Sequence, residues 1–516
     1  MQACSRRGCS LIVERNQTPK SLAAAIQNFI DSSDPIKGQP IHAIIIKSGQ
    51  PPVTNVSIKL LILHLRCGLL ANARKVFDQM PKPTLSAFNY LISGYFKAGI
   101  AGESLDLVRK LACLGEKPDG FTLSMVLKLS SILVSFDIAK QTHTQIIKLE
   151  AGSDDVVFSA LIDSYVKNGM IGYARRVLEA LPRNSLVCST SLIVGYMNEK
   201  SFRDAEEIFK CLVEKDVVVY NAMIEGYSKM MGTASKSFEV YKEMRVEGYN
   251  PTISTVLSVV GACSLLLALE FGHQLHCQFI KSSVYSHVKV GSALIDMYSK
   301  CGWVEDARRI FDHMPDKNVF SWTSMIDGYG KNGVPDEALR LFYHMRCSSE
   351  VKPNYTTFIS VLSACGHAGF VSDGKEIFEC IEKKYSMKPK MEHYACMVDI
   401  LGRAGQLLEA HDFIKKIPEK PNSDVWAALL GASRVHGDVA MADTAANELF
   451  KLSKNERPGA YIALSNTFAA AGEWEGVCAV RDLMKKRRVP RIAGYSWVDT
   501  KDYLDSIMVR KAGKLP

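Results

Sequence analysis

Internal repetition constrains this sequence more than any other feature. Residues 291–302 (GSALIDMYSKCG) closely match residues 158–169 (FSALIDSYVKNG), and more degenerate copies lie at residues 88–99, 322–333 and 394–405. A second block follows a few residues later and places Ala and Phe four apart, as in Ala307 and Phe311. A chain of this kind is expected to be a stack of similar units rather than one globular core.

Each unit is predicted to form two helices. The first carries paired Leu and Ile with a Tyr further on, such as Leu294, Ile295 and Tyr298, which share one helical face. A Lys-x-Gly sequence ends it, since Gly adopts the left-handed conformation found after helices. Ala and Phe share a face of the second helix, which a Met-Pro or Leu-Pro pair ends. We therefore predict an all-α fold, a right-handed α-solenoid superhelix of stacked helix-turn-helix repeats.

The units are not all of one length. Successive starts are separated by 31, 35 or 36 residues, whereas a tetratricopeptide array keeps a period of about 34 residues. The predicted starts are Pro19, Thr54, Leu85, Gly120, Asp155, Leu186, Val217, Ile253, Val288, Val319, Tyr355 and Met391.

Composition narrows the function classes. The chain has 63 Lys and Arg against 54 Asp and Glu, a net charge of +9 that suits a polyanionic partner without proving one. None of the 14 cysteines lies at Cys-x-x-Cys spacing, which disfavours zinc knuckles and redox motifs and favours a reducing compartment. The sequence predicts no cofactor, no metal site and no small-molecule substrate.

Two segments bear on membranes and targeting. Residues 253–269 are mostly apolar, but Ser254, Thr255, Ser258 and Ser264 interrupt them, so we predict a buried helix pair and no membrane association. Residues 1–18 carry three arginines and no continuous apolar run, which is typical of an organellar presequence. We expect a mitochondrial location, with the chloroplast as the alternative.

The alternating lengths and the Tyr/Trp-Asn/Thr-x-Leu/Met-Ile-x-Gly-Tyr openings resemble the pentatricopeptide-repeat (PPR) family, in particular its plant subclass of mixed long, short and standard repeats. The resemblance implies about twelve repeats over residues 19–422. Residues 425–432 (VWAALLGA), 461–466 (YIALSN) and 494–498 (GYSWV) resemble the E-type extension motifs of that subclass, which we assign to residues 423–498. Residues 499–516 form an atypical tail.

Some relatives end in a cytidine-deaminase-like domain with a zinc site. None of the twelve histidines here is followed two residues later by Glu, and the cysteine half of that site is also missing. We therefore expect no catalytic site in this chain.

PPR proteins bind RNA at one repeat per nucleotide, and the resemblance implies that the fifth and last residues of a repeat read the base. Asn89 with Asp119 resembles the uracil pair, and Thr190 with Asp216 resembles the guanine pair. Ser292 with Asn318 and Thr323 with Asn354 resemble adenine pairs. Asn221 with Thr252 leans to pyrimidines, and Ser159 with Ser185 matches no clear pair. The fifth residues Ile58, Leu257, Ile359 and Ala395 are not readable.

Simpler interpretations stand beside these. Asn, Thr, Ser and Asp also cap helices, and this is the better interpretation in the long repeats. The matching histidines His42, His143 and His276 are predicted to pack rather than to bind metal. Residues 328–333 (GYGKNG) match a dinucleotide-binding fingerprint, but they lie at a predicted helix end, without the preceding strand that such a site needs.

Three functions follow. The first is a specificity factor for organellar C-to-U editing that binds single-stranded RNA and recruits a deaminase in trans through residues after Ser423. The second is an RNA-binding factor for splicing, stability or translation. The third, a protein-binding scaffold of tetratricopeptide type, would favour apolar or carboxylate-clamping residues at the fifth places, where Asn, Thr and Ser recur instead.

Overall fold

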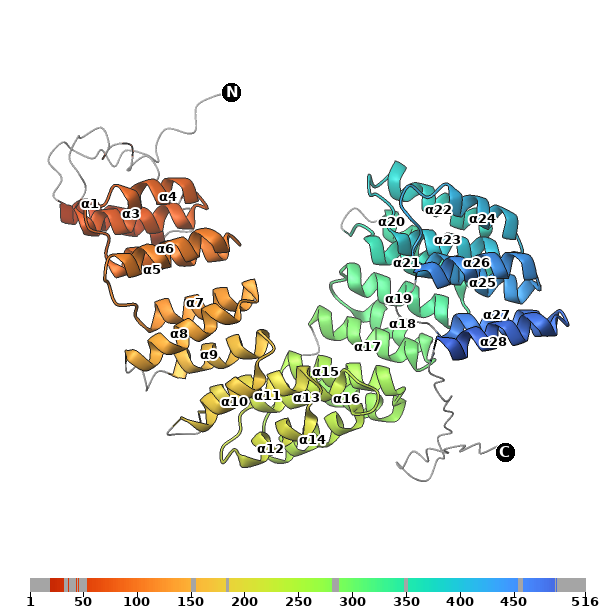
Figure 1. Cartoon of the computed structure of the whole chain (residues 1–516), viewed down its shortest axis with the longest axis horizontal. Helices are drawn as coiled ribbons and strands as arrows, with labels where there is room; N and C mark the ends of the chain where they lie inside the picture. The colour runs from red at the N-terminus through yellow and green to blue at the C-terminus, as the bar shows by residue number, and fades with distance from the viewer. Residues whose placement is uncertain are drawn as a thin grey trace. The chain divides into compact units, whose positions relative to one another are not determined.

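The computed structural model describes residues 19–31, 36, 43, 45, 53–149, 155–181, 185–280, 287–347, 351–452, 458–487 and 489. Within these ranges the chain forms helices joined by short turns, and no residue there is in a strand (Figure 1). The helices belong to two compact units, residues 1–229 with 236–251 and residues 230–235 with 252–516. Each unit is described by itself.

In the first unit, first and second helices alternate along the chain from Thr54 onward. The first helices are α1 (Pro19–Asp31), α3 (Thr54–Arg66), α5 (Leu85–Lys97), α7 (Gly120–Leu133), α9 (Asp155–Lys167), α11 (Leu186–Asn198) and α13 (Val217–Ser228). The second helices are α4 (Leu70–Asp78), α6 (Ala101–Cys113), α8 (Phe136–Lys148), α10 (Ile171–Glu179) and α12 (Phe202–Cys211), and α14 runs from Ala234 to Val246.

The second unit continues the same alternation. Its first helices are α15 (Ile253–Leu266), α17 (Val288–Lys300), α19 (Val319–Lys331), α21 (Tyr355–Ala368), α23 (Met391–Arg403), α25 (Ser423–His436) and α27 (Pro458–Ala470). Its second helices are α16 (Leu269–Ile280), α18 (Val304–His313), α20 (Pro335–Cys347), α22 (Val371–Lys383), α24 (Leu407–Lys415), α26 (Val439–Leu452) and α28 (Trp474–Lys486).

Within each unit, the first helices form one continuous layer. Each first helix packs against the first helix of the next repeat, as α17, α19, α21 and α23 do in turn, and each second helix packs on the first helix of its own repeat. The first helices begin at the residues where the sequence places the unit starts. The predicted all-α solenoid of stacked helical hairpins is therefore confirmed.

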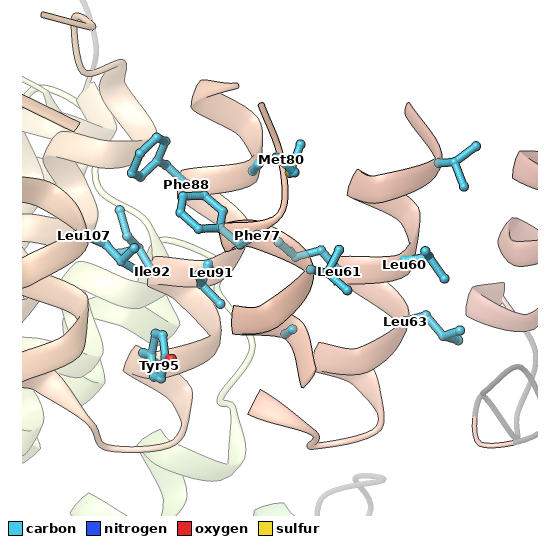
Figure 2. Packing of buried hydrophobic residues seen from close by; sticks show 14 of the residues in the cluster. Leu60, Leu61, Leu63, Phe77, Met80, Phe88, Leu91, Ile92, Tyr95 and Leu107 are labelled. Atoms are coloured by element: carbon cyan, nitrogen blue, oxygen red, sulfur yellow. The ribbon is translucent and has the colours of Figure 1, made fainter. Parts of the chain in front are cut away.

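An edge-to-face ring contact joins successive repeats. The Phe that recurs in the second helices meets the aromatic fourth residue of the next first helix, with ring centroids 4.8 Å apart for Phe77 and Phe88 (Figure 2). The same contact joins Phe209 with Tyr220, Phe311 with Trp322, and Phe342 with Phe358. The Ala four residues before each Phe is fully buried, which lets the hairpins approach closely.

Glycine permits two local features of this stack. Gly302 has φ +84° directly after α17, and Gly169 has φ +71° after α9, a backbone conformation that L side chains rarely adopt. Gly402 lies where α23 meets α25, and a Cβ there would come within 2.5 Å of the Ala432 side chain. The short turns and the close packing of first helices therefore depend on these residues.

The histidines of the long repeats pack between hairpins, as predicted. His143 Nδ1 lies 2.9 Å from the hydroxyl of Tyr165, and His276 Nδ1 lies 2.9 Å from the hydroxyl of Tyr298. Burial lowers the pKa of both imidazoles, which keeps them neutral. In the described part of the chain, no three His, Cys, Asp or Glu side chains gather where they could hold a metal ion. His42 lies outside the described residues.

The structure also bears on the apolar segment 253–269 and on the glycine motif at residues 328–333. Residues 253–269 lie in α15 and the start of α16, a helix pair as predicted, and no described helix is long and apolar enough to cross a membrane. Gly328 and Gly330 lie inside α19, and Gly333 follows it. Because a helix rather than a strand precedes the turn, the dinucleotide fingerprint is a chance match. Residues 1–18 and 499–516 lie outside the described residues.

Candidate nucleic-acid interface

In the repeats that are predicted to read a base, the fifth residue occupies a similar position in the first helix. It directly follows the fourth residue, which is half-buried at Phe158 and buried in the other repeats of this set, so its side chain lies at the edge of the packed face. Asn89, Ser159, Thr190, Asn221 and Ser292 are half-buried, and Thr323 is 8% exposed. The last residue of the repeat lies directly before the next first helix.

Asn89 and Asp119 are in direct contact in the first unit. The Nδ2 of Asn89 donates to both carboxylate oxygens of Asp119 over 3.1 Å. The carboxylate also accepts the backbone N–H of Thr122 at 2.8 Å and caps α7. Partial burial raises the pKa of Asp119, but the hydrogen bonds from Thr122 and Asn89 outweigh it and hold the pKa below its ordinary value. This pair therefore presents a fixed amide and an ionised carboxylate.

Thr323 and Asn354 are joined through a third side chain in the second unit. The hydroxyl of Thr323 lies 2.7 Å from that of Thr357, which in turn donates to Asn354 Oδ1 at 3.0 Å. Asn354 caps α21 by accepting the backbone N–H of Thr357 at 2.9 Å. The two predicted reading residues thus belong to one hydrogen-bonded group.

Thr190 and Asp216 line a common hollow of about 340 Å³ between neighbouring first helices. Val187 of α11 and Val218 of α13 line it as well, together with Lys167 at the end of α9. Val187 and Val218 are 56% and 60% exposed. Two exposed apolar side chains and two polar ones therefore share a recess that is open to solvent.

In two other predicted pairs, the serine at the fifth place bonds a carbonyl of its own helix. Ser292 donates its hydroxyl to the Val288 carbonyl in its own helix at 2.9 Å, while Asn318 caps α19. Ser159 likewise donates to the Val156 carbonyl at 3.1 Å, and Ser185 does not cap α11 through its side chain. Asn221 lies on α13 in the first unit, and Thr252 caps α15 in the second.

At the last residue of a repeat, capping the next helix does not prevent contact with a base. Asp119, Asp216, Thr252, Asn318 and Asn354 each accept a backbone N–H of the following first helix. A carboxylate or amide oxygen has a second lone pair, so the cap leaves further capacity for a ligand. The capping interpretation is thus correct for five of the six last residues, and it also fixes where their side chains lie.

Sequence reasoning named no residue of the exposed apolar set at the second place of the repeats. This set comprises Phe121, Val156, Val187, Val218 and Phe320, all more than half exposed. The second and fifth residues are one helical turn apart and share a face. The signal that could have revealed this set is an apolar residue that recurs at the second place of the repeats. It lies outside the buried helix face that carries Leu, Ile and Tyr.

The hairpins after Ser423 have a different surface. Their first helices, α25 and α27, carry Ala427 and Ile462 at the fifth places, and both residues line a hollow of about 440 Å³ with Arg434 and Asn466. Because Ala427 and Ile462 are apolar, these two hairpins have no polar fifth residue comparable to Asn89. This hollow is therefore apolar with one cationic side chain.

Family models match the repeats and the C-terminal hairpins. The model described as "PPR repeat" matches residues 86–115, 156–186, 187–217, 218–249, 292–319, 356–385 and 392–421, and "PPR repeat family" matches residues 317–367. The model described as "E motif" matches residues 436–499. The pentatricopeptide repeat-containing protein At1g28690, mitochondrial, of Arabidopsis thaliana is 53% identical over 93% of both chains.

The chain belongs to the pentatricopeptide-repeat family.

Other similarities agree with this PPR assignment. The putative pentatricopeptide repeat-containing protein At3g13770, mitochondrial, also of Arabidopsis thaliana, is 36% identical over 89% of this chain and 68% of its own. The crystal structure of PPR10 from maize matches with a TM-score of 0.60 and 16% identity, over 91% of this chain and 74% of that one. PPR10 in complex with an 18-nt psaJ RNA element matches with a TM-score of 0.70 and 16% identity, over 92% and 70%. These structures share the PPR solenoid fold.

Replacing Asp119 with Ala should loosen the start of α7. The substitution removes the N-cap and the partner of Asn89, and cap loss costs about 0.5–2 kcal/mol. In native-state hydrogen exchange, the first-turn amides of α7 should exchange about 2- to 30-fold faster. Ser185→Ala is the matched control, because Ser185 makes no side-chain cap, and it should leave α11 amides unchanged. Equal exchange in α7 of wild type and Asp119→Ala would contradict this assignment.

Proposed function

We propose that this PPR protein binds single-stranded RNA at one base per repeat, and that it is a specificity factor for organellar C-to-U editing. The observation that carries the RNA-binding proposal is the recess that brings Thr190 and Asp216 together between the exposed Val187 and Val218. The proposed reading residues are the six pairs given above, and we assign the chain a binding role without catalytic residues of its own.

The chemistry of the recess suits a nucleobase. A base is a flat ring with an apolar face, so two exposed aliphatic side chains can hold it from both sides. Its Watson–Crick edge would then meet the hydroxyl of Thr190 and the carboxylate of Asp216. Guanine carries N–H donors on this edge, and a carboxylate accepts two such bonds well. The recess therefore supports the guanine assignment of this pair.

Cationic side chains at the ends of first helices suit the phosphates. Lys167 lines the recess, and Lys97, Lys300, Lys331 and Arg403 lie in the last turns of other first helices. Lys167 pairs with Asp163 at 2.7 Å, but the two side chains are 56% and 39% exposed, so the ion pair holds the lysine only weakly. A phosphate of the bound strand could take over this lysine.

Editing is the finer part of the proposal, and the E motif supports it. We propose that the hairpins α25–α28 recruit a deaminase in trans, and that the apolar hollow with Arg434 contributes to that contact. Two relatives carry "mitochondrial" in their names, which supports a mitochondrial location.

Replacing Thr190 with Asn should change one letter of the RNA preference. With Asp216 unchanged, the pair would then match Asn89 and Asp119, so guanine should give way to uracil at one nucleotide. In selection from a randomised single-stranded RNA pool, we expect the ratio of the two bases there to change about tenfold, as one hydrogen bond would give. Preferences at the other nucleotides should persist.

The control for this experiment is Thr144→Asn, the same substitution at an exposed position of the second helix α8. The hydroxyl of Thr144 bonds a carbonyl of its own helix. This variant should leave every preference unchanged. Equal binding of wild type to all pool sequences, or affinity for peptides with none for RNA, would refute the RNA-binding proposal.

Loss of the protein should leave one or a few organellar cytidines unedited. Sequencing of organellar RNA from a loss-of-function line tests this directly. Restoration by the full chain but not by a chain truncated after Pro421 would place deaminase recruitment in the C-terminal hairpins. Normal editing combined with retained introns or altered transcript ends would instead indicate a splicing or stability factor.

A further inference from the structure

A buried hydroxyl connects the fifth and last residues of one predicted pair. Thr122, the third residue of its repeat, is fully buried in α7. Its Oγ1 lies 2.6 Å from Asn89 Oδ1 and 2.7 Å from Asp119 Oδ1, and it shares its one hydrogen between them. Because Oδ1 of Asn89 faces this hydroxyl, Nδ2 is directed to the carboxylate at 3.1 Å. The three side chains therefore fix the orientation of the amide.

The same arrangement occurs in the other compact unit. Thr357 is the third residue of its repeat and is also fully buried. Its hydroxyl lies 2.7 Å from that of Thr323 and donates to Asn354 Oδ1 at 3.0 Å. Asn354 Oδ1 simultaneously caps α21. Two independent sites thus place a threonine hydroxyl between the fifth residue and the last.

Two other predicted pairs lack this connection. In the repeat that begins directly after Asp216, the third residue is Val219, which has no hydroxyl. The hydroxyl of Thr190 instead donates to the Leu186 carbonyl of its own helix at 2.7 Å. In the repeat after Ser292, the hydroxyl of Ser321 donates to the backbone carbonyl of Asn318 at 2.8 Å rather than to a side chain. The fifth residue in these pairs is therefore oriented by its own helix and not by its partner.

We propose that Thr122 and Thr357 are positioning residues that hold two of the base-reading pairs in one orientation before RNA binds. The inference rests on the proposed RNA-binding function. A side chain that is already fixed loses little conformational freedom when a base binds, which strengthens the correct contact. A fixed amide also presents one donor and one acceptor in a set order, so a wrong base meets an unmatched group. The nucleotides facing Asn89–Asp119 and Thr323–Asn354 are therefore discriminated more strictly than those facing Thr190–Asp216 and Ser292–Asn318.

Thr122→Val tests this in the full-length protein with little change in side-chain shape. The probe is a single-stranded RNA pool that is randomised over the bound stretch, and the readout is the ratio of preferred to other bases at each nucleotide. The nucleotide facing Asn89 is identified by Asn89→Ser, which alters only that preference. Thr122→Val should reduce the ratio there about two- to twelvefold, the effect of releasing one ordered side chain, and leave the other ratios unchanged.

Two variants separate positioning from packing. Thr122→Ser retains the hydroxyl and should restore the ratio, which a merely structural role would not require. Thr142→Val is the matched control, since Thr142 is buried in the same repeat but its hydroxyl bonds only the Ile138 carbonyl. It should leave all ratios as in wild type.

A third variant covers the case in which Thr122→Val does not fold. Val219→Thr would introduce the missing hydroxyl beside Thr190 and Asp216 and should raise discrimination at that one nucleotide. An unchanged ratio facing Asn89 in folded Thr122→Val would overturn this inference and leave RNA binding intact. If Thr122→Val does not fold, an unchanged ratio in Val219→Thr would overturn it. If wild type shows no base preference at any nucleotide, the proposed function itself fails.

Discussion

At four junctions between described repeats, an edge-to-face contact joins a second-helix Phe to the aromatic fourth residue of the next first helix and sets the local geometry of the array. Phe77 with Phe88 and Phe311 with Trp322 repeat it with ring centroids about 5 Å apart in separate units. The contact fixes one hairpin against the next and holds the fourth residue in the core. The fifth residue then has to lie at the edge of that core, next to the recess between hairpins.

The helix cap adds a second constraint at the same place. The last residue of a repeat is held by the first turn of the next helix, as Asp119 is held by the Thr122 N–H. Packing therefore positions the fifth residue, and capping positions the last residue. In the proposed function, stability and recognition use the same side chains, because an oxygen that caps a helix still has a lone pair to offer a base.

The sequence was sufficient for the fold because proline, glycine and the apolar period fix where each helix begins and ends. It also led to the pairs, since Asn89 and Asp119 do meet. It could not show which hydroxyls turn toward a partner, because Thr190 and Ser292 can bond their own helix carbonyls equally well. The sequence also gave no sign that the hydroxyl of Thr122 has a role, because a buried Val would fit the same place on the helix. It did not show that Val187 and Val218 are exposed.

The central claim is that each repeat with a polar reading pair contributes one base contact to the proposed RNA site. Deletion of residues 186–216, one complete 31-residue unit, tests it most directly. The account predicts that the protected RNA becomes one nucleotide shorter and loses the letter read by Thr190 and Asp216, while the flanking letters close up and persist. A footprint of unchanged length, with that letter still selected, would contradict it.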